Sequence, residues 1–317
     1  MLALAIDPGH PEVHVETFEL VAEDEQRLGA TLFTPCTAAR ATLIIHGATA
    51  APQSFYRRFA WFAASRGLRV LTYDYRGVGR SRPSSLRGFE ARMSDWAELD
   101  AAAAHRLARE RFPNEPVVTV GHSFGGQLLG LLDAAHEIHA AVLVGAQLGY
   151  LGHWPFWRRL RLYAIWYGLV PVLNAIYGYV PSRAGLGEDL PRGVAEQWAR
   201  WCRHPDYLAS EHADAHERFA RFDRPALFFS FTDDAIAPQR AVNALLDRLM
   251  RAPVVHRRID PREHGGDAIG HFGFFRGRFA GSLWQDTVEF LLEAVPLGAT
   301  PAVLDRALSL PGRARRA

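Results

Sequence analysis

The sequence is poor in cysteine and in net charge. Of its 317 residues only Cys36 and Cys202 are cysteine, and neither belongs to a CxxC pair. Two cysteines build no disulfide framework and argue against a sulfur-based metal or redox site, which fits a reducing compartment. The 36 lysine and arginine residues nearly balance the 34 aspartate and glutamate residues, and no basic stripe is interleaved with aromatic residues. Such a charge pattern argues against nucleic-acid binding.

Export and membrane-spanning signals are also weak. The amino-terminal MLALAIDPGH lacks a basic region, and its apolar run is too short for a signal peptide. We therefore expect a cytoplasmic protein. The 21 positions from Leu162 to Ser182 carry no charge, which is nominally long enough to cross a bilayer. They also contain Pro171 and Pro181, two glycines and four tyrosines. This composition favours a buried or lipid-contacting helical insertion over a transmembrane helix.

Short apolar runs alternate with helical patterns along the chain. Weak alternation over residues 13–34 predicts an antiparallel hairpin, and uninterrupted apolar runs predict strands covered on both faces. The expected strands are residues 41–46, 69–75, 117–120, 140–145, 225–231 and 254–259, and the expected helices are residues 54–66 with Ser54 as cap, 93–112, 126–135, 241–250 and 283–294. This order predicts an α/β fold with a parallel sheet built from βαβ units.

Residues 151–221 have a different character. They hold five of the eight tryptophans and show no strand alternation, so we interpret them as a helical insertion. The insertion would interrupt a core domain of residues 1–150 and 222–300, and a basic tail of residues 301–317 would follow. Its aromatic residues are expected either to pack onto the core or to line an acyl pocket and contact a membrane. The pocket candidates are Trp154, Phe156, Trp157, Trp166 and Tyr167, and the arginines between Trp157 and Arg161 would suit anionic lipid.

The strongest chemical signal is Gly121-His122-Ser123-Phe124-Gly125, followed by Gly126, between a predicted strand and a predicted helix. A serine on such a sharp turn projects its hydroxyl above the sheet edge, and the turn requires small residues two positions to either side. Gly121 and Gly125 meet that requirement. The pattern predicts Ser123 as a nucleophile, and a glycine-rich turn without chemistry is the alternative.

A nucleophilic serine needs an imidazole to accept its proton and a carboxylate to orient that imidazole. His271 follows the last predicted strand and has a small residue before it and bulky phenylalanine after it, whereas its competitor His264 lies among charged residues and glycines. Asp234 follows the strand of residues 225–231 in a D-x-x-x-P loop. It is favoured over Asp233, which suits a turn or a cap.

Attack of such a serine on a carbonyl group also needs backbone donors for the oxyanion of the transition state. One candidate is the N–H of Phe124, directly after the nucleophile. The other is the N–H of Ala48, in the turn after residues 41–46. His46 and Gly47 are expected to support this turn, and His46 is not expected to transfer protons.

The motifs LIIHG, YDYRGVGRS, VGHSFGG, TDDAIAP and GHFGFF follow one another along the chain. On these motifs the chain resembles the α/β-hydrolase fold family of serine hydrolases over most of its length. It is also similar to a bacterial subgroup of predicted α/β hydrolases, in Gly178 to Pro191, Gln197 to Cys202 and Gly270 to Arg276. The resemblance implies an eight-stranded, mostly parallel sheet with a lid inserted after the sixth strand. It leaves the substrate open, because the fold hosts many chemistries.

The residues and the resemblance together predict a hydrolase that cleaves a small-molecule ester with an apolar acyl chain through an acyl-enzyme. Acyl transfer or thioester cleavage on the same triad is the alternative, and a non-catalytic ligand-binding scaffold is the alternative from another class. No cofactor is expected, because the turn of residues 76–80 lacks a dinucleotide pattern. No metal is expected either, because His212 and His216 lack a third ligand. Peripheral membrane contact and the oligomeric state stay open.

Overall fold

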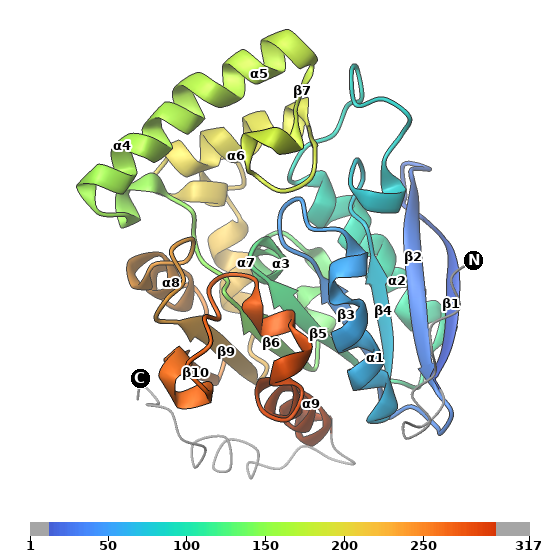
Figure 1. Cartoon of the computed structure of the whole chain (residues 1–317). Coiled ribbons are helices and arrows are strands. Elements are labelled where there is room, and N and C mark those ends of the chain that lie inside the picture. The colour runs from blue at the N-terminus through green and yellow to red at the C-terminus, as the bar shows by residue number, and fades with distance from the viewer. Residues whose placement is uncertain (1–12, 296–317) are drawn as a thin grey trace.

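The computed structural model of the chain describes residues 13–295, which form a central eight-stranded sheet with helices around it (Figure 1). The strands lie in the order β1-β2-β4-β3-β5-β6-β9-β10. Their bounds are β1 Val13–Val21, β2 Arg27–Pro35, β3 Ala41–His46, β4 Leu68–Tyr73, β5 Val117–His122, β6 Ala140–Val144, β9 Ala226–Phe231 and β10 Val254–Ile259. Strand β2 pairs antiparallel with β1 and β4, and the other neighbours pair parallel. The predicted α/β class and the mostly parallel eight-stranded sheet are therefore confirmed.

Helices cover both faces of this sheet. The main ones are α1 Arg57–Ser65, α2 Ala102–Arg111, α8 Gln239–Leu246 and α9 Leu283–Ala294. Side chains alternate between the faces along a strand, so Leu43 and Ile45 of β3 pack in the core with α1 and α9, whereas Ile44 packs in the core with α2 and α8. An uninterrupted apolar run is what this burial on two faces requires.

Helices α4, α5, α6 and α7 lie between β6, the sixth strand along the chain, and β9. The bounds here are α4 Phe156–Ala164, a π-helical stretch Ile165–Leu169, α5 Val170–Tyr177, a small hairpin of β7 Tyr179–Val180 and β8 Leu190–Pro191, α6 Arg192–Arg203 and α7 Ala215–Arg221. Helices α4, α5 and α6 stack above the sheet in Figure 1. Their buried side chains, such as Trp166 and Trp201, join the same core cluster as α2 and α8. The insertion therefore shares a core with the sheet.

The helix predicted over residues 126–135 is wrong in its length. Helix α3 spans only Phe124–Gln127, and two separate 3₁₀ turns follow it. A Cβ on Gly130 would lie 2.2 Å from Cε2 of Phe219, so α7 packs directly against this position. Glycine is also unfavourable inside helices, which applies to Gly130 itself.

Ser54 does not cap a helix as predicted. Residues 53–56 form a 3₁₀ turn, and α1 begins at Arg57 without a side-chain cap. Gln53 is buried, and its backbone N–H and Nε2 donate to the two oxygens of Asp74, each at 2.7 Å. These bonds fix the entrance to α1 and replace the expected cap.

None of the helices within residues 13–295 is long and apolar enough to cross a membrane. The uncharged residues 162–182 instead run from the end of α4 through α5 into β7. The predicted basic tail, residues 301–317, lies outside the described residues.

Candidate active site

Ser123 lies on the turn between β5 and α3 with φ 53° and ψ −112°. Residues other than glycine seldom adopt a positive φ, so this backbone is strained. The turn is tight because a Cβ on Gly121 would lie 2.6 Å from the carbonyl oxygen of Gly125, and a Cβ on Gly125 would lie 2.1 Å from that of His46. The N–H of Ser123 donates to the carbonyl of Val144 at 2.9 Å and ties the turn to β6. The structure thus places Ser123 on the sharp strand-to-helix turn that the sequence predicts.

Asp234 and His271 form a buried pair. Oδ2 of Asp234 accepts a hydrogen bond from Nδ1 of His271 at 2.7 Å, and Oδ1 accepts from the N–H groups of Ile236 and Ala237 at 2.8 and 2.9 Å. Burial acts to raise the pKa of Asp234, but the hydrogen bond and charge of His271 and the two N–H groups hold that pKa below its ordinary value. The carboxylate is therefore ionised at neutral pH, fixes the His271 proton on Nδ1 and leaves Nε2 available.

The neighbouring Asp233 has a different contact. Its Oδ2 accepts from the N–H groups of Ile269 and Gly270, each at 2.9 Å, in the loop that leads to His271. His264, the other histidine weighed, ends a 3₁₀ turn earlier in the chain. Of the two aspartates, Asp234 is the one that contacts the His271 ring.

Two of the three predicted residues, Asp234 and His271, lie close to Gly145. A Cβ there would lie 3.4 Å from both Oδ2 of Asp234 and Nδ1 of His271. Gly145 directly follows Val144, the acceptor for the N–H of Ser123. Within the described residues no hydrogen bond joins the Ser123 hydroxyl to the His271 ring. Catalytic hydrogen bonds are often formed fully only when substrate is bound, so the arrangement is compatible with proton transfer.

The oxyanion donor predicted at Ala48 is not supported. Its N–H donates to Oη of Tyr56 at 2.8 Å and is therefore already paired. The N–H of Phe124 opens α3, where a helix leaves its first donors without intrahelical partners. Of the two predicted donors, only Phe124 is placed to bind an oxyanion without breaking a bond that the structure contains.

His46 is part of a buried side-chain cluster under this loop. Its Nδ1 lies 2.8 Å from Oη of Tyr73, and its Nε2 lies 3.2 Å from Nε2 of His105. Burial, with a contribution from the charge of His105, holds the pKa of His46 well below its ordinary value. The neighbouring Gly47 accepts a hydrogen bond from the hydroxyl of Tyr75 at 3.2 Å. These contacts suit the supporting role that was predicted for His46 and Gly47.

A chain of hydrogen bonds that the sequence did not reveal joins the loops of the site. His122 Nε2 lies 2.9 Å from the carbonyl oxygen of His271, and because a carbonyl only accepts, Nε2 carries the proton. His122 Nδ1 then accepts from the hydroxyl of Tyr56 at 2.9 Å, and the Tyr56 oxygen accepts from Ala48. Burial, followed by the charge of His271, lowers the pKa of His122 to about 3, so the ring stays neutral. The histidine inside GHSFG was the available signal for this chain.

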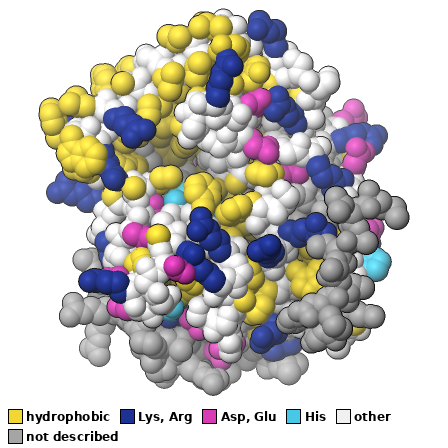
Figure 2. Space-filling view, viewed as in Figure 1, with side chains coloured by type: hydrophobic (Ala, Val, Ile, Leu, Met, Phe, Trp, Pro, Cys, Tyr) yellow, Lys and Arg dark blue, Asp and Glu magenta, His cyan; other side chains and the backbone are white. Residues whose placement is uncertain are grey.

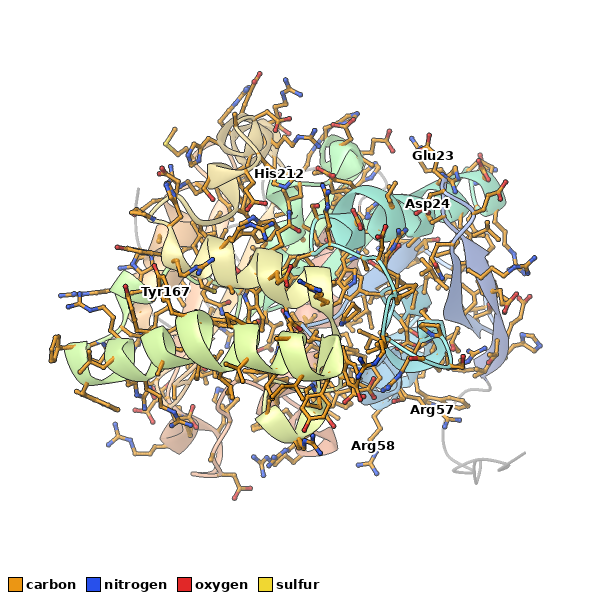
Figure 3. All side chains as sticks on the ribbon, turned by 90° about the horizontal axis from the view of Figure 1, so that it is seen from above. Glu23, Asp24, Arg57, Arg58, Tyr167 and His212 are labelled. Carbon is orange, nitrogen blue, oxygen red and sulfur yellow. The ribbon has the colours of Figure 1, made fainter. Side chains whose placement is uncertain are left out.

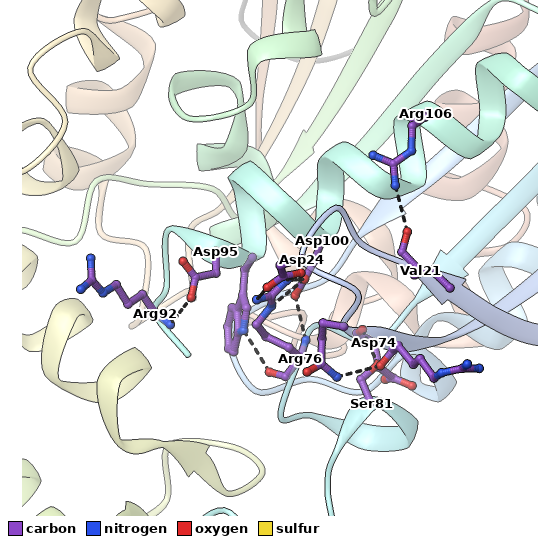
Figure 4. Close-up of polar contacts among 12 residues, drawn as sticks. Val21, Asp24, Asp74, Arg76, Ser81, Arg92, Asp95, Asp100 and Arg106 are labelled. Atoms are coloured by element: carbon purple, nitrogen blue, oxygen red, sulfur yellow. Dashed lines mark hydrogen bonds and ion pairs between the residues drawn. The ribbon is translucent and has the colours of Figure 1, made fainter. Parts of the chain in front are cut away.

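Arg76 holds the turn after β4. Its Nη1 lies 2.6 Å from Asp24, while its Nε and its backbone N–H donate to the two oxygens of Asp100 at 2.7 and 2.8 Å (Figure 4). Burial raises the pKa of Asp100 to about 6, although Arg76 acts to lower it. Trp96 donates to the Arg76 carbonyl at 3.1 Å and stacks on Tyr75, which in turn binds Gly47. The turn of residues 76–80 therefore supports the loop after β3.

The five aromatic residues predicted to line an acyl pocket differ in their exposure. Trp154 and Trp166 are buried, whereas Phe156, Trp157 and Tyr167 are exposed by 66, 64 and 46%. In Figure 3 Tyr167 lies at the side of this helical segment that faces α6, and the guanidinium of Arg203 from α6 lies 4.6 Å from its ring centroid. Successive residues of a helix point to different sides, so these side chains differ in their surroundings, and a common pocket stays a prediction.

Two other features lie apart from these residues. A cavity of about 250 Å³ is lined by residues of β1 and β2 together with Gln53, Ser54, Arg57, Thr72 and Arg80, and by none of the predicted site residues. Across residues 13–295, no group of three or more histidine, cysteine, aspartate or glutamate side chains could hold a metal ion. His212 lies 3.2 Å from Glu98 and so has an acidic partner.

Comparisons with known proteins agree with this architecture. The sequence model of the alpha/beta hydrolase fold family matches residues 42–167, from β3 into the insertion. No curated protein matches the sequence. Among solved structures, the chain is similar to an esterase from Pyrococcus furiosus (15% identity, TM-score 0.58, covering 90% of this chain and 94% of that one). It is also similar to a carboxyl esterase from Bacillus coagulans, with 14% identity and a TM-score of 0.59, and to a lipase in its open form, with 17% identity and a TM-score of 0.60. Each of these two matches covers 89% of this chain and 99% of the other.

At these identities the solved structures establish the architecture, and the family match covers the part of the chain that contains Ser123. The strand order, the serine on its sharp turn and the two comparisons agree. The chain has the α/β-hydrolase fold, as its sequence motifs indicated.

Proposed function

We propose that this protein is a serine hydrolase that cleaves a carboxylic ester with an apolar acyl chain. The observation that carries the proposal is the buried, hydrogen-bonded pair of Asp234 and His271 beside a serine with a strained backbone. A nucleophile, a base and an orienting carboxylate are the groups that acyl transfer to water needs. The named neighbours are esterases and a lipase, which supports ester hydrolysis.

In the proposed reaction, Oγ of Ser123 attacks the ester carbonyl carbon while Nε2 of His271 accepts the hydroxyl proton. Asp234 stabilises the imidazolium through Nδ1, and the N–H of Phe124 binds the oxyanion. His271 returns the proton to the departing alcohol, which leaves an acyl-enzyme. A water molecule then attacks the acyl carbon while His271 accepts its proton, and His271 returns that proton to the Ser123 oxygen as the acid is released.

A second oxyanion donor would complete this site. Ala48 can serve only if Tyr56 releases its N–H when substrate binds, because that N–H is paired at 2.8 Å. The N–H of Ala48 would then exchange the Tyr56 hydroxyl for the oxyanion as its acceptor, and it would have a hydrogen-bond partner in both states. The pairing therefore makes the Tyr56 hydroxyl a competitor of the oxyanion.

We also propose that residues 151–221 act as a lid over a core domain of residues 1–150 and 222–300. The indole of Trp154 and the guanidinium of Arg158 both donate to the carbonyl of Ala235, at 3.2 and 3.1 Å. Ala235 directly follows Asp234, so the insertion is bonded to a loop of the proposed site. Movement of α4 would therefore change the hydrogen bonds at this loop.

The test is labelling of the purified chain with a fluorophosphonate probe, followed by peptide mass mapping. We expect modification at Ser123, loss of labelling in Ser123→Ala and retained labelling in Ser54→Ala, which replaces an exposed serine. Release of free acid from an acyl ester identifies a hydrolase, whereas transfer to an added alcohol or preference for a thioester identifies the alternatives. A folded protein that binds acyl ligands but takes no label would overturn the proposal in favour of a ligand-binding scaffold.

A further inference from the structure

The helical segment from α4 to α5 exposes many large apolar side chains. We call them the outer stripe: Phe156, Trp157, Leu160, Tyr163, Tyr167, Leu169, Val172 and Ile176, each exposed by 39 to 66%. Phe156, Leu160, Tyr163 and Tyr167 follow at helical spacing, so they share one face. The opposite face carries Trp166 and Val170, which belong to the core. Figure 2 shows apolar side chains gathered along the upper left of the molecule, where α4 and α5 lie in Figure 1. So large an exposed apolar face marks an interaction surface.

The stretch of sequence that contains this surface has charged residues of one sign only. Residues 138–187 contain no aspartate or glutamate, but they contain four arginines. Arg159 and Arg161 are exposed on α4 beside the outer stripe. The guanidinium groups of Arg158, Arg159 and Arg203 lie over the rings of Trp157, Phe156 and Tyr167 at 4.9, 5.5 and 4.6 Å from their centroids. An apolar face with aromatic residues and arginines at its border suits the headgroup region of an anionic bilayer.

We propose that the outer stripe binds the surface of an anionic lipid bilayer, with α4 and α5 lying parallel to the membrane plane. One face of this helical segment packs into the core through Trp166 and Val170, and the exposed face is apolar and bordered by basic residues, which is what an interfacial helix needs. The membrane is the one occupant that supplies both an apolar layer and a dense negative surface along the whole length of such a helix.

The surface lies beside the proposed active site. Arg158 at the start of α4 is bonded to Ala235, next to Asp234. Ile236 and Phe272, one or two residues from Asp234 and His271, are also exposed apolar side chains. The inference that the bound lipid surface supplies the ester rests on the proposed function, but the binding itself does not.

The experiment is co-flotation of the full chain with phosphatidylcholine vesicles, with and without phosphatidylglycerol. We expect binding to be stronger with phosphatidylglycerol and to weaken as salt rises. Arg161→Glu should lower the partition coefficient at least about fivefold, because a basic residue near an anionic surface contributes this much. Leu160→Ser should lower it about tenfold through lost apolar burial.

Matched controls lie at the other end of the strands. Met250 is 78% exposed and Arg251 is exposed, and both come shortly before the amino end of β10. Met250→Ser and Arg251→Glu should leave vesicle binding unchanged. Circular dichroism of each variant, together with Val172→Ser as a second substitution in the outer stripe, separates loss of binding from loss of folding.

Vesicle binding is read separately from catalysis. Ser123→Ala should bind vesicles as the parent chain does, and Leu160→Ser should hydrolyse a water-soluble short-chain ester at the parent rate. If the parent chain fails to bind, or binds neutral and anionic vesicles equally, the proposal is overturned whatever the activity. A dimer in light scattering that Leu160→Ser converts to monomer, with no vesicle binding, would overturn it in favour of a second copy of the chain.

Discussion

The ring of His122 donates from Nε2 to the backbone carbonyl of His271 at 2.9 Å. The residue before the proposed nucleophile therefore holds the residue proposed as its base. Because Tyr56 binds the other nitrogen of the same ring and also the N–H of Ala48, one neutral imidazole connects the loop after β3, the serine turn and the His271 loop. This arrangement explains why a histidine with a strongly lowered pKa is buried beside the site.

Tyr56→Phe tests this chain. The variant keeps the buried ring but leaves two buried groups unpaired, the N–H of Ala48 and Nδ1 of His122. Each unpaired buried group costs about 1–3 kcal/mol, so we expect the free energy of unfolding in urea to fall by at least about 2 kcal/mol. Tyr163→Phe, which removes a hydroxyl from an exposed tyrosine, should change it by less than about 0.5 kcal/mol. Equal stability of Tyr56→Phe and the parent chain would show that the hydroxyl bonds contribute nothing.

Asp234→Asn and Asp233→Asn separate orientation of the base from support of its loop. The amide that Asp234→Asn introduces would no longer stabilise the imidazolium or hold its tautomer, so we expect kcat for ester hydrolysis to fall about 10³–10⁴-fold. The amide oxygen at position 233 can still accept from Ile269 and Gly270, so Asp233→Asn should lose less than about tenfold. Steady-state kinetics on the folded variants provide the measurement. A greater loss for Asp233→Asn would reverse the assignment of the acid.

The parts of the fold that the sequence could predict are those that depend on local patterns of residues. Strand β3 has the predicted bounds because a buried parallel strand is an unbroken apolar run, and α9 has the predicted bounds because its apolar residues repeat at helical spacing. The serine turn was visible because it needs glycines at fixed positions within five residues. These features depend on neighbours in the sequence.

What the sequence could not show depends on distant contacts. The partner of Ala48 is a hydroxyl eight residues away, and that hydroxyl binds a histidine 66 residues further on. The break after α3 depends on Phe219, from a helix beyond β6. The outward direction of Phe156 and Trp157 was also hidden, because an apolar helix face predicts burial whether the covering partner is the core or something outside the chain.

Gly125→Ala tests how tightly the serine turn is built. A Cβ at this position would lie 2.1 Å from the carbonyl oxygen of His46, which is backbone of β3 and cannot move aside cheaply. We expect overpacking to cost about 3 kcal/mol or more of unfolding free energy, or to prevent folding, and to abolish probe labelling of Ser123. Gly281→Ala is the matched control, because nothing lies within 4 Å of a Cβ there. If thermal unfolding shows the two variants to be equally stable, the close packing of Gly125 does not constrain the turn.

Three buried imidazoles predict that the fold weakens in acid. Burial lowers the pKa of His105 and of His122 to about 3, and it holds the pKa of His46 well below its ordinary value of 6.5. In the unfolded chain these imidazoles bind protons near pH 6.5, whereas in the folded chain they stay neutral until the pH approaches 3. The free energy of unfolding is therefore unaffected by them above pH 6.5 and falls progressively as the pH is lowered toward 3. Each contributes a slope of about 1.4 kcal/mol per pH unit across this range. Asp100 raises the free energy of unfolding as the pH falls below 6. Its pKa is raised to about 6 in the folded chain, so the folded state binds the proton at a higher pH than the unfolded state does.

Urea unfolding at a series of pH values from 4 to 7 measures the sum of these effects, and His105→Asn isolates one of them. Three histidines outweigh Asp100, so we expect the parent chain to lose stability steadily below pH 6.5. His105→Asn also loses its contact with His46 and should be less stable at pH 7, but its slope should be shallower by about 1.4 kcal/mol per pH unit. His136→Asn, at an exposed position, should leave the slope unchanged. A slope that His105→Asn does not alter would mean that His105 binds its proton equally in the folded and unfolded chains, and acid lability would then have to come from other groups.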